Sequence, residues 1–151
     1  MVGGAGKTRF ILDTGIIIRE LNQDERASQL LNHLRAVGVV EVSSITVMEI
    51  FAGCRDEEEE AGAAQLFELI RPIALGVEAA AVAGKLVRKY PGIFGRAIQR
   101  GSPDALIAAT AICANARLIT LDRKDFRQIK EPDLAITILE QSAQSWVPLH
   151  F

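Results

Sequence analysis

Four acidic residues stand at positions where side chains often carry out chemistry. Asp13 and Asp122 follow apolar, strand-like runs, Glu49 follows the β-rich segment VVEVS by a few residues, and Asp104 opens an apolar helical pattern. Carboxylates that are crowded together repel one another, so some become protonated unless a cation lies between them. Oxygen-only clusters suit a hard divalent ion such as Mg²⁺ or Mn²⁺. An ion held in this way binds phosphate and activates water for in-line attack.

Each acid also has a purely structural interpretation. Asp13 could form an Asx turn, and Glu49, three residues after Thr46, could close a capping box. Asp104 would suit the dipole at a helix N-terminus, and Asp122 could cap the short helix expected after it. Taken singly, the acids are therefore more often structural, least so for Asp13. The case for chemistry depends on the four side chains lying together.

Two motifs near the N-terminus suggest other chemistry, and both fail. The stretch GAGKT ends like a phosphate-binding P-loop, but the first glycine of that motif would fall on Met1, and a strand rather than a helix is expected after Thr8. The triplet Asp-Thr-Gly at 13–15 is found in aspartic proteases, which are β-rich and pair two such aspartates. This chain soon turns helical and alanine-rich. Residues 1–8 are accordingly predicted to be a flexible leader.

The composition limits the number of domains, the kind of partner and the cellular compartment. The chain has 151 residues, of which 49% are hydrophobic, enough for one domain with its own core. A net charge of -2 argues against general coating of a polyanion but leaves room for a local basic groove. Cys54 and Cys113 lie in apolar patterns without a metal-binding spacing, which predicts buried, reduced thiols. No signal peptide or membrane-length apolar run is seen, and we expect a cytoplasmic protein.

The elements that must position the acids alternate along the chain. Short apolar runs predict strands at 9–13, 39–43, 71–74, 117–121 and 135–139. Helical spacing predicts helices at 24–38, 45–53, 57–70, 77–90, 102–116 and 124–129, with Ser102 as an N-cap and Pro103 as the first helical residue. This alternation indicates a three-layer α/β domain with a mainly parallel sheet. Residues just past the carboxyl ends of such strands converge on one ligand site.

Four motifs, in this order, resemble those of PIN-domain proteins, and more narrowly of the VapC-type toxins of bacterial toxin–antitoxin pairs. They are ILDTGIII (11–18), SSITVMEIFAG (43–53), SPDALIAATAI (102–112) and LITLDRKDF (118–126). The resemblance implies a single α/β/α PIN-like domain over 9–151. It also implies an endoribonuclease that depends on Mg²⁺ or Mn²⁺, inhibition by a small cognate antitoxin, and a homodimer. One departure is Gly15, where the family more often has Asn.

Carried over by position, the resemblance makes Asp13, Glu49, Asp104 and Asp122 the acidic quartet, with Asp125 as an auxiliary carboxylate. Asp13 and Asp104 would be the principal metal ligands. Glu49 and Asp122 would complete the shell or orient the attacking water.

Neighbouring residues could support these acids. Thr14 and Thr120 could hydrogen-bond to them, although threonine at a strand end is more often structural. A basic region without acids, residues 80–102, holds Arg96 and Arg100 on the approach to Asp104. These two arginines are the predicted contacts to RNA phosphates.

Two other classes of protein remain open. One is a catalytically inactive PIN-like module that binds RNA or protein, although the intact quartet argues against it. The other is a metal-dependent phosphatase or nucleotide hydrolase on another α/β scaffold. A phosphatase of the haloacid-dehalogenase kind would carry a second aspartate two residues after Asp13, where this chain has Gly15.

Overall fold

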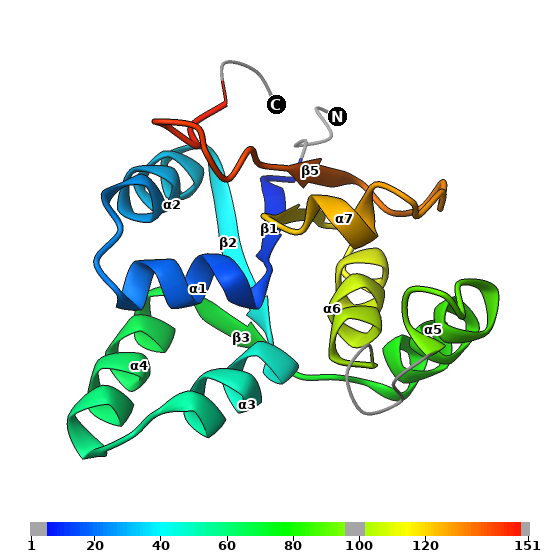
Figure 1. The fold of residues 1–151 in the computed structure, drawn as a ribbon, viewed down its shortest axis with the longest axis horizontal. Coiled ribbons are helices and arrows are strands. Elements are labelled where there is room, and N and C mark those ends of the chain that lie inside the picture. Colours follow the sequence, from blue (N-terminus) through cyan, green and yellow to red (C-terminus); the bar gives the residue numbers. More distant parts are fainter. Residues whose placement is uncertain (1–5, 96–101, 149–151) are drawn as a thin grey trace, which may run out of the picture.

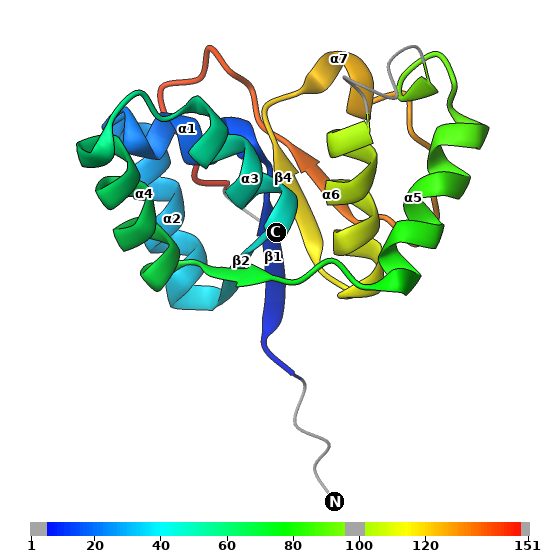
Figure 2. The ribbon, with the colours of Figure 1, turned by 90° about the horizontal axis from the view of Figure 1, so that it is seen from below.

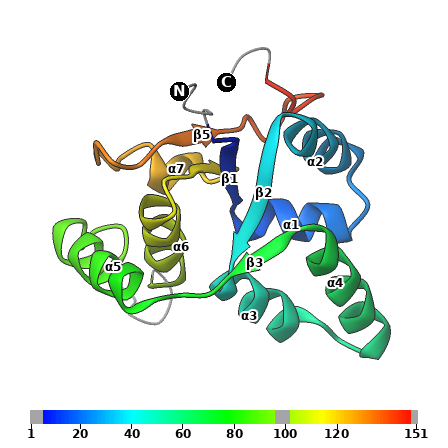
Figure 3. The ribbon, with the colours of Figure 1, turned by 180° about the vertical axis from the view of Figure 1, so that it is seen from behind.

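A parallel sheet forms the middle of the molecule. The computed structural model describes residues 6–95 and 102–148, and within them five strands follow the order β3-β2-β1-β4-β5. All four neighbouring pairs are parallel. Figure 3 shows β3 on the outer side of β2, at one edge of the sheet. The strands are β1 (Thr8–Leu12), β2 (Gly38–Ser43), β3 (Arg71–Ile73), β4 (Arg117–Thr120) and β5 (Ile136–Ile138).

Helices cover both faces of this sheet. Helices α1 to α4 lie on one side and α5 and α6 on the other (Figures 1 and 2). The predicted three-layer α/β architecture with a parallel sheet is therefore confirmed. No helix in the described residues has the length and apolarity that crossing a membrane requires. The helices are α1 (Thr14–Leu21), α2 (Glu25–Val37), α3 (Ser44–Gly53), α4 (Glu57–Leu69), α5 (Val77–Lys89), α6 (Ser102–Cys113) and α7 (Arg123–Phe126).

The central strand divides the core into two halves. Successive side chains of a strand point to opposite faces. Phe10 and Leu12 of β1 accordingly pack with buried residues of α1, α2 and α4, whereas Ile11 packs with α5 and α6. All three side chains are at most 1% exposed. Both faces of β1 are thus buried, which explains why its sequence is apolar without alternation.

Several details differ from the sequence-based expectations. Helix α1 begins directly after Asp13, in a segment for which no element is predicted, because three consecutive isoleucines carry no helical period. Strand β1 begins at Thr8, inside the predicted leader, of which residues 1–5 lie outside the described part. Helix α6 already includes Ser102, the predicted cap.

The predicted burial of the two cysteines is wrong. Cys54 is half-buried and Cys113 is exposed, and both thiols are free. Helix α6 is apolar almost all round, so its sequence does not distinguish the side that faces the sheet from the outer side. Cys113 lies in the last turn of that helix, beyond its buried alanines.

Candidate active site

The predicted site residues gather where the order of the strands reverses. From the central β1 the chain proceeds to β2 and β3 on one side, and then to β4 and β5 on the other. In open parallel sheets, ligands bind at such a switch point, beyond the carboxyl ends of the strands. Asp13 follows β1, and its amide donates to the carbonyl of Ile119 in β4 at 2.9 Å. Asp122 lies two residues after the end of β4, so neighbouring strands deliver these two acids to the same edge.

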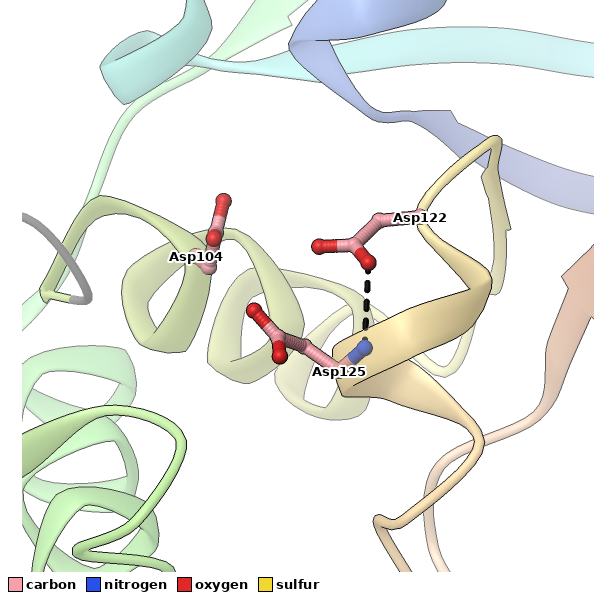
Figure 4. A group of neighbouring side chains, drawn as sticks. All are labelled: Asp104, Asp122 and Asp125. Carbon is pink, nitrogen blue, oxygen red and sulfur yellow. Dashed lines mark hydrogen bonds between the residues drawn. The ribbon is translucent and has the colours of Figure 1, made fainter.

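Three aspartates form the tightest group. Each of Asp104, Asp122 and Asp125 offers a carboxylate oxygen, and these oxygens lie within 4.8 Å of one another (Figure 4). Asp104 comes from the first turn of α6, and Asp122 is the N-cap of α7. The Asp122 Oδ1 atom accepts a hydrogen bond from the Asp125 amide at 3.0 Å. The structure thus gives Asp125, an auxiliary residue in the sequence-based assignment, as central a position as Asp104 and Asp122.

Asp13 is the most buried of the five acids of the site, with 8% of its surface exposed. Its two oxygens accept hydrogen bonds from the Thr14 amide, at 2.9 Å, and from the Thr120 hydroxyl, at 2.6 Å. Burial raises the pKa of Asp13, as do the charges of Asp122 and Glu49, whereas the two hydrogen bonds lower it. Asp13 is also the N-cap of α1, so it has a structural role and a place among the acids.

Glu49 is held by a hydroxyl rather than by a helix cap. The Thr14 hydroxyl donates to Oε1 of Glu49 at 2.8 Å. The alternative in which Thr46 and Glu49 form a capping box does not apply, because the N-cap of α3 is Ser43, whose side chain accepts from the Ile45 amide. Thr46 therefore lies in the first turn of α3 and Glu49 in the second.

The charges of the other four acids act on Asp104. Partial burial is the largest cause that raises the pKa of Asp104, to about 7, followed by the charges of Asp13, Asp122, Glu49 and Asp125. A donor set made of carboxylate oxygens, partly exposed and mutually repelling, fits a hard divalent cation such as Mg²⁺ or Mn²⁺. Burial and repulsion both favour a bound cation over the empty cluster of charges.

The two threonines named from the sequence both touch acids. Besides its bond to Asp13, the Thr120 oxygen accepts the amide of Asp122 at 3.0 Å. Thr14 contacts Asp13 through its amide and Glu49 through its hydroxyl. Both therefore do more than end a strand or begin a helix.

The basic residues are placed only in part. Arg96 and Arg100, the predicted RNA contacts, lie outside the described residues. Lys89, in the same basic region, is paired with Glu131 at 2.7 Å. A second basic group, which was not expected from the sequence, follows Asp122 at helical spacing. Its members are Lys124, Arg127 and Lys130. All three are exposed, and none forms an ion pair with the described part of the chain.

Comparison with known sequences gives one family over most of the chain. The PIN domain family model matches residues 10–132. Ribonuclease VapC19 of Mycobacterium tuberculosis is 32% identical over 127 residues, which cover 82% of this chain and 95% of that protein. Ribonuclease VapC of Rickettsia bellii is 29% identical over 129 residues, with coverage of 81% and 91%.

Solved structures share the fold. A toxin–antitoxin complex from Klebsiella pneumoniae contains a chain with a TM-score of 0.65 and 27% identity, covering 83% of this chain and 94% of that one. VapBC2 from Rickettsia felis, bound to a DNA fragment from its promoter, has a TM-score of 0.73 at 22% identity, with coverage of 88% and 100%. At 22% identity, the similarity to VapBC2 from Rickettsia felis concerns the fold alone.

Proposed function

The chain belongs to the PIN-domain family, and on that premise we propose that it is an endoribonuclease that hydrolyses RNA phosphodiester bonds. The observation that carries the proposal is the convergence of five acids at the switch point of the sheet, three of them with oxygens within 4.8 Å of one another. The similarity to proteins named ribonuclease VapC, over more than nine-tenths of their length, supports the choice of RNA as substrate.

The acids would hold Mg²⁺ or Mn²⁺. Asp104, Asp122 and Asp125 are the closest set of donors, and Asp13 and Glu49 lie near enough for their charges to act on Asp104. When bound, such an ion lowers the pKa of a coordinated water and offsets charge that develops on the phosphate. The residues fit this role because they supply oxygen donors only.

The residues of the chain itself have separable tasks. The two hydrogen bonds that Asp13 accepts favour its charged form, but burial outweighs them and keeps its pKa above the ordinary value, so a bound cation would supply the remaining stabilisation of the carboxylate. Glu49 has one oxygen engaged by Thr14, and its Oε2 atom can complete the metal shell or accept a hydrogen bond from the attacking water. Burial and the charges of the neighbouring acids raise the pKa of Asp104 to about 7, so that without a cation this group changes charge near neutral pH.

We propose further that the protein is the toxin of a toxin–antitoxin pair. The relatives named VapC and the structural neighbour described as a toxin–antitoxin complex support a small antitoxin protein as its partner. An RNA-cleaving toxin with two free thiols would act in the cytoplasm. Homodimerisation stays a prediction, to be measured by sedimentation.

Cleavage of RNA by purified protein tests the enzyme assignment. Structured RNA is incubated with Mg²⁺ or with EDTA, beside Asp104→Asn and, as a matched control, Asp133→Asn, which changes an exposed aspartate outside the acidic group. We expect metal-dependent cleavage that is lost in Asp104→Asn and kept in the control. Folded wild-type protein that binds RNA without cutting it would instead indicate a catalytically inactive module.

Three further measurements separate the remaining alternatives. Millimolar Mg²⁺ should raise the melting temperature, because an ion that binds only the folded state stabilises it, and Asp13→Asn should blunt the rise. Hydrolysis of small phosphate esters in place of RNA would favour a phosphatase. Toxicity on expression, relieved by a neighbouring small reading frame, would support the toxin assignment, and its absence would count against it.

A further inference from the structure

A chain of two hydroxyls leads from the core to Glu49. Thr46 is completely buried, and its Oγ1 atom lies 3.0 Å from Oγ1 of Thr14. The Thr14 hydroxyl in turn donates to Oε1 of Glu49 at 2.8 Å. A hydroxyl has a single hydrogen. Because Thr14 uses its hydrogen on Glu49, Thr46 must be the donor in the first contact, and the direction of donation runs from Thr46 through Thr14 to Glu49.

Thr14 ties together two acids from different elements. Its amide donates to Oδ1 of Asp13, and its hydroxyl donates to Glu49 of α3. The Oε1 atom of Glu49 is therefore occupied, while Oε2 accepts no hydrogen bond from the part of the chain that the structure describes. Without Thr46, the Thr14 hydroxyl would keep its bond to Glu49 but lose the donor that holds its oxygen from the side of the core.

We propose that Thr46 is a positioning residue of the metal site. By donating to Thr14, it fixes the Thr14 hydrogen on Oε1 and so holds the Glu49 carboxylate with Oε2 available. Hydrogen bonds in a buried chain strengthen one another, and partners behind a metal ligand tune metal affinity and activity by about 10- to 100-fold. The proposal rests on the proposed function, since it presumes that the acids hold a divalent ion.

Binding of Mn²⁺ without RNA provides the test. Thr46→Val removes the hydroxyl and keeps the branched shape, and we expect about tenfold weaker Mn²⁺ binding by calorimetry. Thr46→Ser keeps the hydroxyl and should bind Mn²⁺ within about twofold of the wild type. Thr110→Val is the matched control, because it removes another buried threonine hydroxyl, which donates to the Leu106 carbonyl within α6, lies 3.3 Å from the Ser43 hydroxyl, and forms no hydrogen bond with any of the five acids. The control should keep wild-type affinity.

A double-mutant cycle tests the order of the chain. If Thr46 acts only through Thr14, Thr46→Val should add nothing to the loss already caused by Thr14→Val. Losses that multiply would overturn the proposal, as would wild-type Mn²⁺ affinity in Thr46→Val. If Thr46→Val does not fold, the comparison of Thr46→Ala with Thr46→Ser isolates the same hydroxyl. Equal Mn²⁺ affinity of these two variants would overturn the proposal.

The outcomes also separate this proposal from the enzyme assignment. Wild-type protein that binds Mn²⁺ without cleaving RNA would contradict the ribonuclease function. The double-mutant cycle, which measures Mn²⁺ affinity, would still test the role of Thr46. Wild-type protein that binds no Mn²⁺ would overturn both. With active enzyme, Thr46→Val should lower kcat about tenfold and leave KM unchanged, since Thr46 does not contact substrate.

Discussion

The hydroxyl of Thr120 donates to Oδ2 of Asp13 across 2.6 Å. The oxygen of that hydroxyl also accepts the amide of Asp122 at 3.0 Å. Thr120 is the last residue of β4, and the pairing of Leu12 with Ile119 brings the ends of β1 and β4 together. One side chain thus connects the acids that follow two neighbouring strands, and it is fully buried.

Thr120→Val should weaken the site without disturbing the fold. The substitution removes a hydrogen bond that lowers the pKa of Asp13, so that pKa should rise further and the carboxylate should compete less well for a cation. We expect a loss of about 10- to 100-fold in Mn²⁺ affinity and in RNA cleavage. The acid limb of the pH–rate profile should move to higher pH. Thr120→Ser, which keeps the hydroxyl, should retain both properties, and equal losses in the two variants would contradict this role.

Asp104 should make the metal-free protein less stable as the pH rises. Its pKa is about 7 in the fold against an ordinary 3.8, so between these values the unfolded chain releases a proton that the folded chain keeps. The free energy of unfolding must then fall as the pH rises from about 4 to about 7, and level off above. At pH 8, Asp104→Asn should exceed the wild type by roughly 1–2 kcal/mol, discounted for partial exposure, with no difference at pH 4.

Denaturant titrations in EDTA at several pH values measure this effect. Added Mn²⁺ should remove the deficit of the wild type at pH 8 and leave Asp104→Asn nearly unchanged, because the neutral amide is a poor ligand. The measured quantity is the free energy of unfolding of the wild type minus that of Asp104→Asn. If this difference does not fall between pH 4 and pH 8, Asp104 lies in a more polar setting than the structure gives it.

The sequence predicted the layers and the edge of the sheet at which the acids meet. Both follow from strand ends, and Asp13 and Asp122 stand next to apolar runs that could scarcely be anything but buried strands. Helix α1 was missed, because Ile16, Ile17 and Ile18 suit a strand as well as a helix. The N-cap at Asp13 starts that helix, and the cap becomes recognisable only when the end of β1 is known.

Finer features of the site depend on distances that no spacing encodes. The interval from Thr46 to Glu49 matches a capping box, yet the earlier start of α3 puts both side chains against Thr14. Asp125 joins the closest group because α7 is capped by Asp122, which turns its first residues toward α6. Such arrangements follow from the packing of whole elements rather than from local propensity.

The ion pair of Arg9 and Glu41 should contribute to stability. Arg9 contacts both oxygens of Glu41, at 2.7 and 2.9 Å, and also donates to the Ala114 carbonyl just after α6. Glu41 is 4% exposed. Arg9→Met leaves that carboxylate buried without its partner, but because the Arg9 side chain itself is 39% exposed, the loss in the free energy of unfolding should be about 2 kcal/mol, below the range for a fully buried pair.

Urea denaturation of three variants checks this prediction. The double replacement Arg9→Met with Glu41→Leu should recover most of the loss, because removing both charges leaves none unpaired. Arg55→Met breaks a pair with Glu59 in which the arginine is 84% exposed, and it should cost less than about 1 kcal/mol. Similar losses in Arg9→Met and Arg55→Met would contradict a special role for the pair that holds the buried Glu41 carboxylate.

Lys124, Arg127 and Lys130 should contribute to RNA binding. They are exposed, unpaired within the described residues, and carried by the same short segment as Asp122 and Asp125. Replacing all three by glutamine should weaken RNA binding and reduce its salt dependence. The slope of log K against log salt should fall by about 0.7 for each RNA phosphate that the variant no longer neutralises.

Binding is measured in Asp104→Asn protein, so that cleavage does not interfere, with Arg35→Gln as an exposed control on α2. The control should keep the slope, because Arg35 lies on a helix that carries none of the acids. A parallel variant, Arg96→Gln with Arg100→Gln, tests the RNA-binding residues predicted from the sequence. If only this second variant changes the slope, the RNA backbone follows the approach to α6 rather than α7.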